Sequence, residues 1–71
     1  MTRNERRILA RRALKYLAGE GLTAVDLAAK LRLPYRTVYN WIKSGRAPHP
    51  AALTRLVRMA TGWGFKPGRN A

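Results

Sequence analysis

The sequence predicts a small all-α domain of four to five helices over residues 1–62, followed by a basic C-terminal tail over residues 63–71. Apolar residues recur at three- and four-residue spacing, which is the period of an amphipathic helix. Glycine and proline divide the 71 residues into four such blocks, and a chain of this length makes one domain. We expect roughly the last six residues to be disordered, because chain ends pack poorly.

The first helix is predicted over about residues 4–18. Thr2 and Glu5 have the spacing of a capping box, in which each side chain bonds the other residue's backbone amide at a helix start. Gly19 interrupts the apolar pattern and is expected to end the helix. The apolar positions of this helix are Ile8, Leu9, Ala13, Leu14 and Leu17.

The second helix is predicted to start at about Ala24 and to end before Pro34. Thr23 can cap the amide of Asp26, whose carboxylate also favours the positive end of the helix dipole. Pro34 disfavours helical geometry at the residue before it and suits the first turn of a following helix. The apolar positions of the second helix are Leu27, Ala28 and Leu31.

The third helix, about residues 34–43, has one apolar face and one polar face, and Gly45 is expected to close it. The side chains expected to pack inward are Val38, Trp41 and Ile42. The outward face carries Tyr35, Arg36, Tyr39, Asn40 and Lys43. This contrast predicts a helix that is anchored on one side and offers polar groups on the other.

The fourth helix is predicted over about residues 50–61, after a proline-rich bend. Its apolar positions are Leu53, Leu56, Val57 and Ala60. We interpret His49 as a loop residue, because it has no cysteine or acidic cluster beside it. Trp63 and Phe65 follow the helix, and a place in the core is favoured over a dimer contact for both.

The charge balance indicates a polyanionic partner. Lysine and arginine number 15 against 3 acidic residues, for a formal net charge of +12 and an isoelectric point near 11.8. Basic side chains that neutralise phosphates release condensed counterions, so such a surplus favours nucleic acid over a merely solvated basic surface or membrane adhesion.

Several functional classes lack the residues they need. With no cysteine, 1 histidine and 3 acidic residues, we expect no enzyme activity, no catalytic residues, no metal site, no cofactor and no small-molecule substrate. No run of roughly 18 apolar residues predicts a membrane span, and arginines interrupt any secretory signal. We therefore expect a cytoplasmic, nucleoid-associated protein without a membrane partner.

Residues 27–42, LAAKLRLPYRTVYNWI, have the pattern of a helix-turn-helix unit, with two short helices, a tight turn and an apolar stripe on each helix. They resemble the lambda-repressor and Cro-like class of phage and bacterial regulators, with a leucine-alanine pair in the first helix and threonine-valine and tryptophan in the second. The resemblance extends over about residues 5–62. Arg32 stands where that class usually has glycine, because the turn often needs a positive φ, and Pro34 replaces the usual serine or threonine cap.

The resemblance implies a transcriptional repressor that binds double-stranded DNA as a homodimer on a two-fold symmetric operator. It also implies that the helix over residues 34–43 lies in the major groove. The side chains implied to contact bases are Tyr35, Arg36, Tyr39 and Asn40. Those implied to contact phosphates are Thr23, Thr37, Lys43, Ser44 and Arg46.

The residues leave alternatives open. Residues 37–48 also resemble excisionases, architectural DNA-binding proteins that usually continue into a strand-rich wing. A basic helical domain also fits an RNA-binding protein or an antitoxin. Several basic residues outside the motif stay open between a phosphate-facing or protein-binding role and a solvated face. They are Arg6, Arg7, Arg11, Arg12, Lys15, Arg55 and Arg58.

Overall fold

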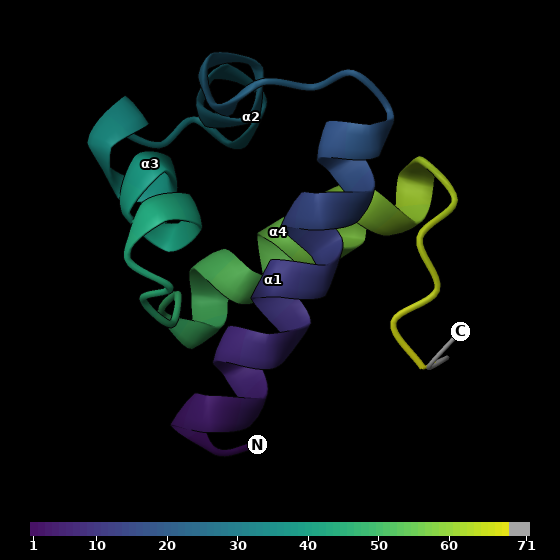
Figure 1. Cartoon of the computed structure of the whole chain (residues 1–71). Coiled ribbons are helices and arrows are strands. Elements are labelled where there is room, and N and C mark those ends of the chain that lie inside the picture. Colours follow the sequence, from purple (N-terminus) through teal and green to yellow (C-terminus); the bar gives the residue numbers. More distant parts are fainter. Residues whose placement is uncertain (69–71) are drawn as a thin grey trace.

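Four α-helices make up the described part of the chain, residues 1–68, and this part contains no strand. The computed structural model orders them as α1 (Arg3–Gly19), α2 (Ala24–Leu31), α3 (Tyr35–Lys43) and α4 (Pro50–Gly62). α1 packs mainly against α4, while α2 and α3 form a second pair that meets α1 through α3 (Figure 1). The predicted all-α class is confirmed. The end of the predicted tail, residues 69–71, lies outside the described residues.

The element after α3 distinguishes the lambda-repressor and Cro-like class from the excisionases, the two families that the motif resembles. An excisionase-like protein is expected to continue into strands after α3. The chain instead bends through residues 45–49 and forms α4, within one residue of the predicted range. The structure therefore lacks the strand-rich wing over residues 45–62, and α4 packs against α1 instead.

Capping boxes start α1 and α2. The sequence predicts the box at Thr2 and, at α2, only the cap that Thr23 provides to the Asp26 amide. The Thr2 hydroxyl accepts from the Glu5 amide at 3.1 Å, and the Glu5 carboxylate accepts from the Thr2 amide at 2.7 Å. At α2, the Thr23 hydroxyl accepts from the Asp26 amide at 3.2 Å, and the Asp26 carboxylate accepts from the Thr23 amide at 2.9 Å. These bonds satisfy amides that have no partner within a helix, so each helix start is set by residues three positions apart.

The chain reversals after α1 and α4 occur at glycines that lie two residues beyond the glycines predicted to end these helices. Gly21 has a φ of +91° and Gly64 a φ of +109°. After α4, the Phe65 amide donates to the Ala60 carbonyl at 2.9 Å, which is one bond of a Schellman motif. A Cβ atom on Gly64 would lie 2.6 Å from the Tyr16 hydroxyl, so glycine is required there by conformation and by space.

An arginine holds the corresponding left-handed position at the end of α2. Arg32 has a φ of 56° and a ψ of 46°, and the following Leu33 amide donates to the Ala28 carbonyl at 3.0 Å. The positive φ typical of glycine at this turn is therefore present, although the residue is not glycine. A side chain in this conformation costs about 1 kcal/mol.

We expect Arg32→Gly to raise the free energy of unfolding by about 0.5–1 kcal/mol, because relief of the Cβ strain exceeds the extra entropy of a glycine in the unfolded chain. The corresponding rise in Tm is about 2–8 °C for a domain of this size, measured by circular dichroism. Arg32→Ala is the matched control, since it removes the same charge and keeps the strain. Equal stabilisation by both variants would assign the effect to charge and contradict the prediction.

The core lies where α1 and α4 meet the α2–α3 pair. Leu17, Val38 and Leu56 have no exposed surface, and Trp41 is 7% exposed. The other buried hydrophobic side chains are Ala10, Ala13, Leu14, Leu27, Ala28, Leu31, Leu53, Ala60 and Phe65. Residues from all four helices contribute, so the packing of this cluster determines how α3 is held.

Two apolar residues predicted to face inward are exposed instead. Ile8 is 50% exposed, because it lies two residues before Ala10, about 200° of helical rotation from the buried stripe of α1. Ile42 is 47% exposed, and the prediction that it anchors α3 is wrong. It follows Trp41 by one residue, or about 100° of rotation, and Trp41 is the side chain that enters the core.

The segment after α4 folds back along α1. The Tyr16 hydroxyl donates to the Trp63 carbonyl at 2.8 Å, and its ring lies 5.6 Å from the Phe65 ring. Phe65 is 7% exposed, as predicted for a core residue, whereas Trp63 is 42% exposed and the same prediction is wrong. Arg12 lies over the Phe65 ring and donates to the Pro67 carbonyl at 3.2 Å, within the stretch predicted to be disordered.

Candidate nucleic-acid interface

The outward face of α3 brings together all four residues predicted to contact bases. Tyr35, Arg36, Tyr39 and Asn40 line one hollow of about 350 Å³. Their spacing of three and four residues makes them neighbours on the helix surface. The two tyrosines are 50% and 41% exposed and their rings are 5.7 Å apart. Because this face is open to solvent, its hydrogen-bonding groups can meet a partner.

Ile42 belongs to the same exposed face, which the sequence interpretation missed. It lies seven residues after Tyr35 and three after Tyr39, so the three apolar side chains follow one another along the helix. Its spacing of four residues from Val38 led to the prediction that Ile42 faces inward with Val38 and Trp41. The structure assigns it to the exposed side, where it lines a separate hollow at the C-terminal end of α3.

A second hollow, of about 220 Å³, lies at the C-terminal end of α3. Three residues predicted to contact phosphates line it, namely Lys43, Ser44 and Arg46, and α1 adds Arg7 and Arg11 from the opposite side. Arg7 and Arg11 are four residues apart on one face of α1, a signal visible in the sequence. That this face meets the end of α3 is decided by the packing of α1 on α3.

The two threonines predicted to contact phosphates line neither hollow. Thr37 is half-buried on α3. The Thr23 hydroxyl accepts from the Asp26 amide and donates to the Asp26 carboxylate at 3.0 Å, so it lies beside an anion. Thr37 stays a prediction, and Thr23 occupies a position that is unfavourable for a phosphate.

Carboxylates are held away from the candidate interface. Hydrogen bonds from the backbone amide and then the hydroxyl of Thr2 lower the pKa of Glu5, and the same two groups of Thr23 lower the pKa of Asp26. Both side chains are thus ionised at neutral pH and engaged at helix N-termini. No carboxylate lines either of the two described hollows, so their charge is entirely positive.

Other kinds of site find little support among residues 1–68. This stretch contains no group of three histidine, cysteine or acidic side chains that could hold a metal ion. The predicted loop residue His49 caps α4 instead, because its Nδ1 atom accepts from the Ala51 amide at 3.2 Å. None of the described helices combines the length and apolar character needed to cross a bilayer.

Comparison with known proteins agrees with this geometry. Residues 3–46 match the homeodomain-like domain family, and the match extends from the start of α1 through α3 to Arg46. Neither a curated protein nor a solved structure matches the chain. The family match supports helix-turn-helix DNA binding and does not distinguish the lambda-repressor and Cro-like class. Since more than half of the 71 residues are matched, the chain belongs to the homeodomain-like family of helix-turn-helix domains.

Proposed function

We propose that the protein is a sequence-specific transcriptional regulator that binds double-stranded DNA with α3 in the major groove. The observation that carries this proposal is the exposed hollow on α3 shared by Tyr35, Arg36, Tyr39 and Asn40. The second helix of a helix-turn-helix unit presents its outward side chains to base edges when it lies in the major groove. The net charge of +12 supports a duplex as the partner.

The chemistry of the exposed side chains matches the donor and acceptor pattern of the major groove. Arg36 can donate two hydrogen bonds to guanine, and Asn40 can bond adenine through its amide. Tyr35, Tyr39 and Ile42 offer apolar surface to thymine methyl groups. Each good bidentate contact contributes about 1–3 kcal/mol of discrimination between bases, so Arg36 and Asn40 carry most of the proposed sequence preference.

The hollow at the end of α3 supplies the backbone contacts in this proposal. Arg7, Arg11, Lys43 and Arg46 surround it with four positive charges, and Ser44 adds a hydroxyl. A phosphate of the duplex backbone fits such a site, because it accepts hydrogen bonds from all of these groups. Contacts of this kind position α3 on the duplex and carry no base preference.

We also propose that two copies bind one operator with two-fold symmetry, as a Cro-like repressor does, with half-sites one helical turn apart. The high positive charge of each copy opposes association in free solution, and the phosphates between the half-sites offset this repulsion. We therefore expect two copies of the chain to associate on DNA and to associate far less in its absence.

A binding selection on random duplexes tests the base-reading role of α3. We expect the unchanged chain to select a symmetric site, and Arg36→Ala to lose preference at one or two base pairs per half-site, a loss of about 1–3 kcal/mol of discrimination. Its affinity for unrelated duplexes should fall only modestly.

Lys15→Ala is the control, since Lys15 is exposed on α1 and lines neither hollow. This variant loses one positive charge and should keep the selected sequence. An identical selected sequence for Arg36→Ala would contradict the proposed reading by α3, and selection of single-stranded or structured RNA over duplex DNA would contradict the proposed function as a whole.

A further inference from the structure

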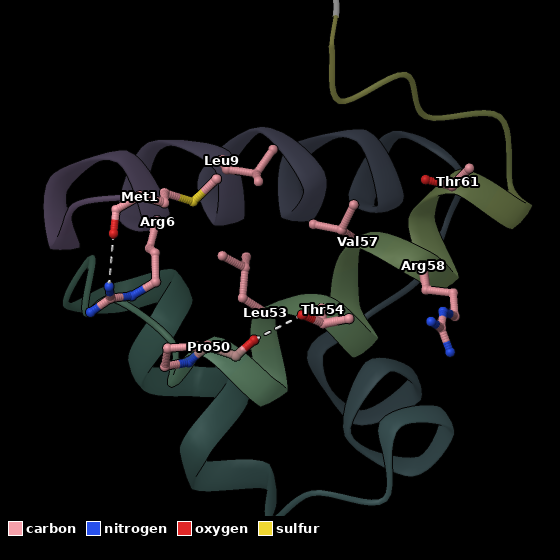
Figure 2. Close-up of a pocket in the computed structure, with 9 residues that line it drawn as sticks. All are labelled: Met1, Arg6, Leu9, Pro50, Leu53, Thr54, Val57, Arg58 and Thr61. Carbon is pink, nitrogen blue, oxygen red and sulfur yellow. Dashed lines mark hydrogen bonds between the residues drawn. The ribbon is translucent and has the colours of Figure 1, made fainter.

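An apolar groove of about 630 Å³ runs between α1 and α4, separate from the candidate nucleic-acid interface. Leu9 of α1 faces Leu53 and Val57 of α4 across it (Figure 2). Leu53 forms the buried part, at 5% exposed, while Leu9 and Val57 are half-buried. No residue of α2 or α3 lines the groove, so an occupant leaves the outward face of α3 free.

Two arginines stand at opposite ends of this groove (Figure 2). The Nε atom of Arg6 is buried and has no hydrogen-bond partner among the described residues, and its Nη1 atom donates to the Met1 carbonyl at 3.4 Å. Arg58 is exposed at the other end. No carboxylate lines the groove, so neither guanidinium group has an acidic neighbour in the lining, and carboxylates of a partner would complement both charges.

A second copy of this chain is a poor occupant. Each copy carries a net charge of +12. In a two-fold contact centred on the groove, the Arg6 end of one copy meets the Arg58 end of the other, which places like charges together. A duplex is also unsuitable, because the apolar floor offers phosphates no hydrogen bonds. The groove is therefore complementary to a partner that has both apolar and acidic side chains.

We propose that the groove between α1 and α4 binds an acidic amphipathic helix of another protein. The apolar face of that helix packs on Leu9, Leu53 and Val57, as helices do in apolar grooves elsewhere. Carboxylates near its two ends bond Arg6 and Arg58, which fixes its position along the groove. This partner binds while α3 is on DNA, so the protein links a DNA site to a second protein.

The test uses the full chain and a synthetic helical peptide of about 15 residues, roughly four turns, with leucines on one face and glutamates at both ends of that face. A peptide of the same composition in scrambled order is the control for attraction by charge alone. Fluorescence anisotropy measures the Kd, and NMR amide shifts locate the site. We expect the amphipathic peptide to bind at least about tenfold more tightly than the scrambled one. The shifts should centre on Leu9, Leu53 and Val57.

Variants of the chain separate the groove from the rest of the basic surface. Arg58→Gln and Arg6→Gln should each weaken binding of the amphipathic peptide by about tenfold, and Val57→Lys should abolish it. Lys15→Gln is matched in charge to the arginine variants, lies outside the groove, and should leave the Kd unchanged. Arg58 is exposed, so Arg58→Gln retains a folded chain even where Arg6→Gln does not.

Three outcomes overturn the proposal. Equal affinity for the scrambled peptide means that charge alone drives binding. Amide shifts centred on α3 mean that the peptide occupies the candidate nucleic-acid interface. Concentration-dependent shifts at Leu9 and Val57 without peptide, together with dimer formation in sedimentation equilibrium, mean that a second copy occupies the groove.

Discussion

Raising the salt concentration from about 50 to 200 mM should weaken DNA binding by about a hundredfold for each bound copy. The four cations around the hollow at the end of α3 are Arg7, Arg11, Lys43 and Arg46. Neutralising one phosphate each gives a slope of about −3.6 in a plot of the logarithm of the association constant against the logarithm of salt concentration. A fixed short duplex and fluorescence anisotropy measure this slope.

The double variant Arg7→Gln with Arg11→Gln separates these contacts from net charge. Its slope should fall to about half that of the unchanged chain, because two of the four phosphate contacts are lost. The pair Arg3→Gln with Lys15→Gln is the control, since it has the same net charge and both residues are exposed on α1 outside the hollow. If both pairs lowered the slope equally, α1 would act through overall charge, and the proposed backbone contacts of Arg7 and Arg11 would be wrong.

Trp41→Ala should remove much of the stability of the folded chain. Trp41 is 7% exposed and is one of the two side chains that anchor α3 in the core, the other being Val38. Truncating a buried tryptophan costs about 3–5 kcal/mol, including the cavity left behind. At about 0.05–0.15 kcal/mol per residue, a chain of 71 residues has roughly 4–11 kcal/mol in total. We therefore expect Tm to fall by about 12 °C or more, or the chain to be largely unfolded, as measured by circular dichroism.

Trp63→Ala is the matched control, because it makes the same substitution at a side chain that is 42% exposed. The backbone carbonyl of Trp63 that accepts from Tyr16 remains in the variant. We expect a change within about 0.5 kcal/mol, which is usual for surface positions. A comparable loss of stability in both variants would show that Trp63 is as important to the core as Trp41, contrary to its exposure.

Neighbouring residues were enough to predict the helix starts. The capping box at Thr2 and the cap at Thr23 require partners only three residues away, and both occur as expected. The ends of α1 and α4 were also predicted, since these helices end at Gly19 and Gly62, the first glycine of each segment. Local spacing did not indicate that the chain reverses at a later glycine in the left-handed position. After α1 and α4 this residue is Gly21 and Gly64, two positions later than the first glycine in each segment.

The candidate interface was likewise predictable where it depends on neighbouring residues and not where it depends on helix packing. The grouping of Tyr35, Arg36, Tyr39 and Asn40 follows from helical spacing, which is a local property. Spacing placed Ile42 on the inward face with Val38 and Trp41, and this was wrong, because the direction in which α3 packs leaves Ile42 47% exposed.

The sequence by itself determined an all-α helix-turn-helix chain with an outward polar face on its third helix. Helix period, caps and turns depend on residues a few positions apart. The tertiary structure alone decided that Arg7 and Arg11 approach Arg46, that Phe65 is buried while Trp63 is not, and that α1 and α4 enclose an apolar groove. These contacts join residues more than 30 positions apart in the chain, where the packing angle between helices, and no local pattern, sets which side chains meet.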